Sequence, residues 1–186
     1  SDKKSDNTEI YIVEGESAGG CFSGETCVAL ADGRNLSFKE LVEENKQGKE
    51  NFCYTIKSDG TIGIEKIENP RLTKENAEVI RIILDDDKEI ICTPDHKFML
   101  RDGNYKEAKD LEKEDSLMPY HQVVELVQSY NHKIKRIEWL KQKIDVYDIE
   151  VPNTHNFALA LGVFVHNSAK MARNKENQAI LPLKGK

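Results

Sequence analysis

A chain of 186 residues that is 38% hydrophobic and 32% charged has the composition of a soluble globular protein with one modest core. The formal net charge of −6 disfavours binding to nucleic-acid phosphates, which requires clustered Lys and Arg, so no nucleic-acid partner is expected. No apolar run is long enough to span a membrane, and the polar start SDKKSDNTEI lacks the regions of a signal peptide. A cytoplasmic monomer that needs no cofactor is therefore expected.

Residues 21–167 alternate β-branched and aromatic residues with polar ones, and Gly, Asp and Asn turns interrupt them. Residues 1–20 and 168–186 lack this sequence pattern, so the central part is predicted to be the folded domain. ADG and SDG turns indicate two hairpins, and many short strands with frequent turns indicate an all-β architecture. In chain order, the predicted strands lie in residues 26–30, 34–37, 52–56, 61–67, 79–84, 89–93, 97–100, 146–151 and 157–167.

A short helix is predicted after Ser37, because Ser37 and Glu40 form an S-x-x-E capping box. The stretch 119–145 contains five Lys or Arg and few turn residues. It is interpreted as a linker or short helical excursion, and a solvated connection is favoured over a remnant of a DNA contact. Trp139 in this stretch is expected to be a packing anchor.

The cysteines show no C-x-x-C spacing and no dense framework, so neither a structural zinc site nor a disulfide scaffold is favoured. Cys53 and Cys92 lie in β-like apolar segments and are predicted to be small buried hydrophobes. For Cys27, core packing is favoured over a regulatory disulfide with Cys21.

The ends of the central part interrupt a motif. EGESAGG stops at Gly20, VFVHN closes at Asn167, and joining Gly20 to Ser168 gives the continuous sequence EGESAGGSAKMARN. A nucleophile at the start of the insert, His-Asn at its end and a hydroxyl residue after it are the groups that a chain needs to excise itself. Protein splicing is therefore the predicted function.

In the first step of this chemistry, Cys21 attacks the Gly20 carbonyl and converts the peptide bond into a thioester. Gly20 helps because it has no side chain to block the attack. The leaving nitrogen needs a proton and the oxyanion needs stabilisation. Thr93 and His96 in the segment CTPDHKF are predicted to point at this spot from a strand-to-turn junction, with the pKa of His96 in the useful range for proton donation.

In the last steps, Ser168 accepts the acyl group, and the side-chain amide of Asn167 attacks its own main-chain carbonyl to form a succinimide. The freed amine of Ser168 then attacks its own ester and leaves an amide to Gly20. Either His166 or His155 is expected to assist the cyclisation, and the sequence does not divide the roles. No metal is required, although zinc on Cys21, His96, His155 and His166 would inhibit by occupying the thiolate.

Two alternatives to splicing are autocleavage without ligation and an inert insertion in a DNA-binding fragment. Asn167 followed by Ser168 argues against the first, and the acidic balance argues against the second. A zinc-binding module has the right ligand types but no local ligand spacing.

Four blocks in order, CFSGETCVALADGR, TPDH, VYDIEVPNTHNFAL and VFVHN, resemble an intein of the Hint family. The resemblance implies a horseshoe-like β fold with one or two short helices. It also implies that Cys21 is the first nucleophile, that Thr93 and His96 assist it, and that His155 is a site residue of the third block together with Asp148. The residues implied to act at the downstream junction are His166, Asn167 and Ser168. Asp148 is implied to coordinate the first and second steps, with a salt bridge or turn cap as its alternative role. No homing endonuclease is expected, because only the 119–145 stretch lies where one would be inserted.

The flanks, YIVEGESAGG and SAKMARNKENQAILPLKGK, resemble the segment of DNA gyrase B that carries the catalytic acidic residue of its Toprim domain. This resemblance implies that Glu14 is a magnesium-binding or acid-base residue in the mature host. The other acidic motifs of that domain are missing from this chain, so no topoisomerase activity is expected. The flanks would act as exteins, the partners joined in cis.

Overall fold

Strands are the main regular elements of the structure, as the alternation predicts. The computed structural model describes residues 20–120 and 132–167. The elements are β2 (Phe22–Ser23), β3 (Cys27–Ala29), β4 (Asn35–Ser37), α1 (Phe38–Lys46), β5 (Phe52–Ile56), β6 (Ile62–Lys66), β7 (Glu68–Ala77), β8 (Ile80–Leu84), β9 (Glu89–Cys92), β10 (Lys97–Met99), β11 (Tyr105–Glu107), the 3-10 helix η1 (Ala108–Asp110), β12 (Ile134–Trp139), β13 (Ile144–Glu150), β14 (Asn156–Ala158) and β15 (Phe164–His166).

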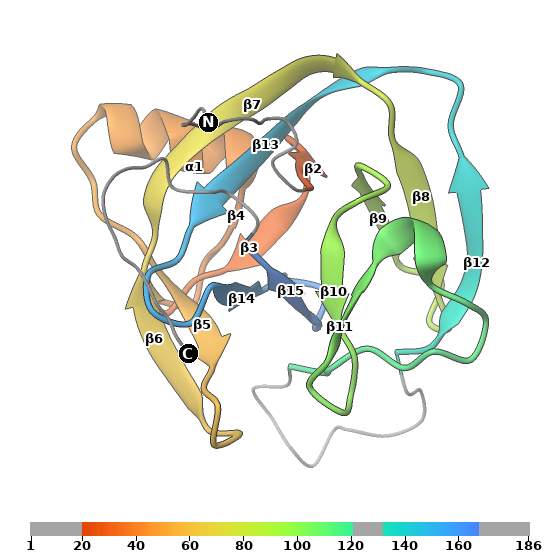
Figure 1. The fold of residues 1–186 in the computed structure, drawn as a ribbon. Coiled ribbons are helices and arrows are strands. Elements are labelled where there is room, and N and C mark those ends of the chain that lie inside the picture. The colour runs from red at the N-terminus through yellow and green to blue at the C-terminus, as the bar shows by residue number, and fades with distance from the viewer. Residues whose placement is uncertain (1–19, 121–131, 168–186) are drawn as a thin grey trace, which may run out of the picture.

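Two larger sheets and two hairpins organise these strands. One sheet has the order β12-β8-β9-β2-β13-β7 and the other the order β11-β10-β15-β14, while β3-β4 and β5-β6 form separate hairpins. Figure 1 shows β7 and β13 side by side along the top, leading over to β8 and β12, with β15 and β10 in the middle of the arch. This outline is the horseshoe-like all-β fold that the sequence resemblance implies.

An aromatic cluster at the centre fixes the start of the domain. Phe22, directly after Cys21, is fully buried and stacks on Phe38 with ring centroids 5.5 Å apart. The rings of Phe98 and Phe157 meet Phe22 edge-on at 6.3 and 6.2 Å. Burying each such side chain contributes about 1.5–3 kcal/mol. Phe22 therefore anchors Cys21 to the core rather than leaving it on a loose end.

The predicted helix and hairpins are confirmed. Ser37 caps α1, its hydroxyl accepting from the Glu40 N–H at 3.1 Å while the Glu40 carboxylate accepts from the Ser37 N–H at 2.8 Å. The two hairpins pair as antiparallel β3-β4 and β5-β6. Cys53 and Cys92 are fully buried, as expected of small hydrophobes.

The interpretation of 119–145 as a linker is wrong for its second half. Residues 134–139 form β12, which pairs with β8, and β13 begins at Ile144. In β12 the buried Ile134 and the half-buried Ile137 are three residues apart, so simple alternation does not mark this strand. A register shift between Ile134 and Arg136 in the pairing with β8 accounts for this spacing. Trp139 is 58% exposed at the end of this strand, so it is not a packing anchor.

Strand β7 is not predicted by the sequence pattern. Its ten residues, ENPRLTKENA, show no apolar alternation and include Pro70. Because β7 is the last strand of its sheet, a proline without an N–H is tolerated there. Across residues 20–120 and 132–167, the structure contains no helix that is long and apolar enough to cross a membrane.

Candidate active site

Two hydrogen bonds join Cys21 to Thr93 at the upstream junction. The N–H of Cys21, in the peptide bond that is predicted to break, donates to Thr93 Oγ1 at 2.8 Å, and the N–H of Thr93 donates to the Cys21 carbonyl at 2.8 Å. The Thr93 hydroxyl donates in turn to Asp95 Oδ1 at 2.8 Å. A chain of hydrogen bonds therefore runs from the Asp95 carboxylate to the backbone nitrogen of Cys21.

A tight turn brings His96 to the same place. The N–H of His96 donates to the Thr93 carbonyl at 3.2 Å, and Pro94 occupies the second position of this turn, where its fixed φ is favourable. The side chains of Thr93 and His96 thus converge on the Gly20-Cys21 bond, as the T-x-x-H spacing predicts.

His96 is fully buried against the aromatic cluster, with its ring centroid 4.0 Å from that of Phe22 and 5.7 Å from that of Phe98. Burial lowers the pKa of His96 to about 4, although hydrogen-bonding contacts with the backbone of Gly20 and of His166 raise it. The expected pKa in the useful range near neutrality is therefore wrong, because the apolar surroundings disfavour the charged ring. At neutral pH, the ring of His96 is therefore uncharged.

These two backbone contacts connect the ends of the domain. Gly20 precedes the first residue of the insert and His166 precedes the last, and the backbone of each lies close enough to the ring of His96 to raise its pKa. The strands support this arrangement, because Phe98 on β10 pairs with Val165 on β15. One imidazole therefore lies between the two junctions.

The thiol of Cys21 is buried and neutral. Burial raises the pKa of Cys21 far above its usual value, Asp148 raises it further, and a hydrogen bond from Thr73 lowers it. On β13, Val146 pairs with Ser23 and Tyr147 with Phe22, so the next step of this register places Asp148 opposite Cys21. Asp148 is buried within a strand, and its Oδ1 accepts from the Ile149 N–H at 2.8 Å, so it is not a turn cap.

Gly20 leaves no room for a side chain. A Cβ at this position would lie 2.1 Å from Cα, 2.2 Å from Cβ and 2.5 Å from N of His96. These atoms belong to the turn that positions His96 and are not the end of a flexible side chain. Glycine is therefore the only residue that fits before Cys21 without moving the junction.

Replacing Gly20 by alanine is expected to slow thioester formation roughly 10- to 100-fold, because overpacking costs about 1–3 kcal/mol. The measurement is hydroxylamine-induced release of residues 1–20 from a chain that carries Asn167→Ala. Gly63→Ala is the matched control, since its added Cβ meets only the flexible end of Lys57, with Cε at 2.6 Å. Equal rates in parent and Gly20→Ala chains would contradict the prediction.

The downstream junction is fixed by the turn between β13 and β14. Asn167 is 3% exposed, and its N–H donates to the His155 carbonyl at 2.8 Å. Its side-chain Oδ1 accepts a hydrogen bond from the N–H of Val151. The turn itself suits the sequence, because Asn153 tolerates the left-handed φ of 70° that it adopts there. The same turn thus holds both the backbone N–H and the side-chain amide of Asn167.

Both candidate histidines adjoin Asn167. His155 has an exposed side chain and contributes its backbone carbonyl. His166 is half-buried, and its ring meets that of Tyr105 edge-on with centroids 4.8 Å apart. The structure thus brings both residues to the junction, His155 through its backbone carbonyl and His166 as the residue that precedes Asn167.

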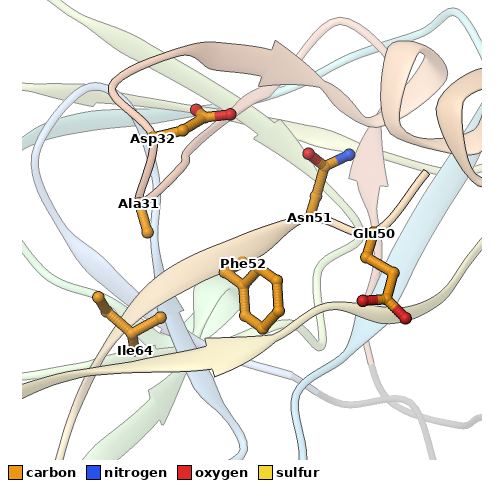
Figure 2. A pocket seen from close by; sticks show the side chains of 6 residues that line it. All are labelled: Ala31, Asp32, Glu50, Asn51, Phe52 and Ile64. Atoms are coloured by element: carbon orange, nitrogen blue, oxygen red, sulfur yellow. The ribbon is translucent and has the colours of Figure 1, made fainter.

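The remaining predicted features lie elsewhere. Ser168 and Glu14 lie outside the described residues. Within the described ranges no three His, Cys, Asp or Glu side chains form a group able to hold a metal ion, so Cys21, His96, His155 and His166 are not arranged as a zinc site. A surface pocket of about 250 Å³, shown in Figure 2, contains none of the predicted site residues and is lined by Ala31, Asp32, Glu50, Asn51, Phe52 and Ile64.

Sequence reasoning missed three groups at the site: the Thr73 hydroxyl at Cys21 Sγ, the Asp95 carboxylate at Thr93 and the Val151 N–H at Asn167. Asp95 lies inside the TPDH block, and its position next to His96 is a usable signal. The other two depend on strand pairing and on a backbone amide, which leave no mark on residue type.

Comparisons with known proteins identify the architecture. A family model described as the intein splicing domain matches residues 28–167. A DnaB intein from Synechocystis sp. PCC 6803 superposes with a TM-score of 0.67 at 24% identity over 81% of this chain and 99% of that one. The gp41-1 intein superposes with a TM-score of 0.57 at 22% identity, over 80% and 99%. At these identities the solved structures show a shared fold.

The DNA gyrase B protein of Synechocystis sp. is 65% identical over 124 residues, which are 67% of this chain and 12% of that protein. The replication factor C small subunit of Methanocaldococcus jannaschii is 26% identical over 100 residues, 54% of this chain and 5% of that protein. This chain thus spans only a small part of each relative. Because the family model covers residues 28–167, most of the chain from β3 to Asn167, the chain belongs to the intein splicing domain family.

Proposed function

We propose that residues 21–167 excise themselves autocatalytically and join Gly20 to Ser168. The observation that carries this proposal is the position of His96, which packs against Gly20 and whose buried ring lies close enough to the backbone of Gly20 and of His166 for both to raise its pKa. Packing of the two chain ends against each other does not by itself require a buried histidine between two peptide bonds, close to a thiol and an asparagine. Two cleavages at one centre are what splicing requires.

The first step forms the thioester at Cys21. Sγ of Cys21 bonds to the carbonyl carbon of Gly20, the bond from that carbon to the Cys21 nitrogen breaks, and the net proton transfer is from sulfur to nitrogen. Thr93 holds the N–H of that nitrogen and His96 adjoins the Gly20 backbone, so both act where charge develops. Asp148, close enough to raise the thiol pKa, is the group proposed to receive the sulfur proton.

The later steps use Asn167 and Ser168. The Ser168 hydroxyl attacks the thioester and releases Cys21 Sγ, which gives a branched ester. Asn167 Nδ2 then attacks its own carbonyl carbon and releases the Ser168 amine, which attacks its ester to form the final amide. The Val151 N–H supports the cyclisation, because a donor at Oδ1 stabilises the negative charge that grows there as Nδ2 loses a proton. His155 and His166 are the proposed flanking assistants.

The host of the insert is proposed to be a DNA gyrase B protein. The flanks resemble its segment around Glu14, and the 124-residue match to the Synechocystis sp. protein is longer than both flanks together. That match must therefore extend into the insert, so a DNA gyrase B with a similar insert exists. Excision would restore EGESAGGSAK in the host.

The experiment is mass spectrometry of this chain expressed between two unrelated folded proteins. Splicing yields a free 21–167 product with a C-terminal succinimide, or asparagine after its hydrolysis, and a ligated partner joined through Gly20 and Ser168. Hydrolysed fragments without the ligated partner would favour autocleavage and contradict the proposal. An uncleaved chain would contradict both.

A further inference from the structure

Thr73 is the extra residue of a β-bulge beside Cys21. On the paired strands, Val146 lies opposite Lys74 and the next residue, Tyr147, lies opposite Leu72, so Thr73 has no partner of its own. Leu72 and Lys74 are both exposed, whereas Thr73 is half-buried. Bulges occur next to active sites, where they re-aim a side chain. This bulge turns the Thr73 side chain inward, across β13 and toward the strand that begins after Cys21.

The hydroxyl of Thr73 has two contacts. Its Oγ1 lies 2.8 Å from Cys21 Sγ and 3.1 Å from the carbonyl oxygen of Val146. Since a hydroxyl has one proton, it donates to one of these atoms at a time. With a neutral thiol, Thr73 donates to Val146 and accepts the S–H of Cys21. With a thiolate, rotation of the O–H lets it donate to sulfur without moving any heavy atom.

The groups around Cys21 have opposing effects on the pKa of its thiol. Burial, Asp148 and Asp95 all raise the pKa of the Cys21 thiol, while the Thr73 hydrogen bond and the charge of Arg71 lower it. The apolar neighbours Ala77, Val79 and Val146 offer sulfur no hydrogen-bond donor from their side chains. Among the described residues, Thr73 is the side chain that is placed to donate a hydrogen bond to Cys21 Sγ.

We propose that Thr73 is a further catalytic residue of the first splicing step, whose hydroxyl orients the Cys21 thiol and stabilises its sulfur as the anion forms. This inference rests on the proposed function of Cys21. As the proton leaves sulfur, Thr73 transfers its hydrogen bond from the Val146 carbonyl to Sγ. The Sγ–C bond to Gly20 then forms and the C–N bond to Cys21 breaks. The Thr73 proton stays on Oγ1 throughout, so the residue donates a hydrogen bond and not a proton.

The test uses a chain with Asn167→Ala and Ser168→Ala, which halts after the first step, and measures hydroxylamine-induced release of residues 1–20. Thr73→Val keeps the shape and removes the hydroxyl, and we expect a rate about 10-fold or more below the parent, since hydrogen bonds to charged groups are worth more than neutral ones. Thr73→Ser restores the hydroxyl and should return within about twofold of the parent. Thr61→Val, at a turn where the hydroxyl donates only to Asp59, should leave the rate unchanged.

A second readout separates catalysis from folding. In a chain with Cys21→Ala, cleavage after Asn167 depends on the fold but not on the thiol, so Thr73→Val should leave its rate unchanged. The inference is overturned if Thr73→Val matches the parent in release of 1–20, if it slows both cleavages equally, or if Thr73→Ser fails to restore the rate. If Cys21→Ala itself still released residues 1–20, the proposed function would fail and not this inference alone.

Discussion

Replacing Asn167 by alanine is expected to reduce ligated product and free residues 168–186 at least about 1,000-fold, because only water remains to break the downstream bond. Asn167 carries the intramolecular nucleophile and is held by the Val151 N–H and the His155 carbonyl. Thioester or branched ester should accumulate, since the first steps do not use its amide. Mass spectrometry with and without hydroxylamine distinguishes these species from the intact chain.

Asn167→Asp is the matched control for this change. Aspartate keeps an oxygen that can accept from the Val151 N–H, but it lacks the amide nitrogen. The variant should fold as the parent does and fail to release residues 168–186 at a comparable rate. If Asn167→Ala or Asn167→Asp still ligated normally, cyclisation by the side-chain amide would be the wrong mechanism.

The sequence is sufficient to predict those parts of the fold in which local pattern and final structure agree. The β5-β6 hairpin follows from alternation around SDG, and α1 follows from its capping box. The convergence of Thr93 and His96 follows from a turn of four residues containing Pro94. In each case the decisive interactions lie within a few residues, so they leave a readable pattern.

The remaining features depend on contacts between distant segments. β7 is a strand because β13 pairs with it and not because ENPRLTKENA favours strands. The sequence contains seven threonines, and only the bulge in that pairing marks Thr73 as a residue of the site. The same limit applies to the pKa of His96, which is set by Phe22 and Phe98 packed around the ring rather than by its own motif. Residue types thus predict which chemistry a site can carry out, whereas the pKa values of its groups depend on the folded structure.

Replacing His96 by glutamine is expected to slow thioester formation about 100-fold or more, which is the usual contribution of a positioned acid-base or hydrogen-bonding group. His96 adjoins the Gly20 backbone inside the aromatic cluster, so its N–H can stabilise charge where no water reaches. The measurement is hydroxylamine-induced release of residues 1–20 from a chain with Asn167→Ala and Ser168→Ala. In a chain with Cys21→Ala, the effect on cleavage after Asn167 reports how far His96 also serves the His166 side.

The pH dependence of the same reaction tests the form in which His96 acts. Because its pKa is lowered to about 4, the ring stays neutral from pH 8 down to about pH 5 and gains a proton only below that range. Over this interval the raised pKa of Cys21 means that the thiolate fraction grows with pH, so the rate should rise steadily with no break near the ordinary histidine pKa. A break near pH 6.5 in the parent that is absent from His96→Gln would show instead that His96 titrates normally and acts as a charged acid. A neutral imidazole fits the site better, since it can donate a hydrogen bond to the Gly20 oxyanion without placing a positive charge among Phe22 and Phe98.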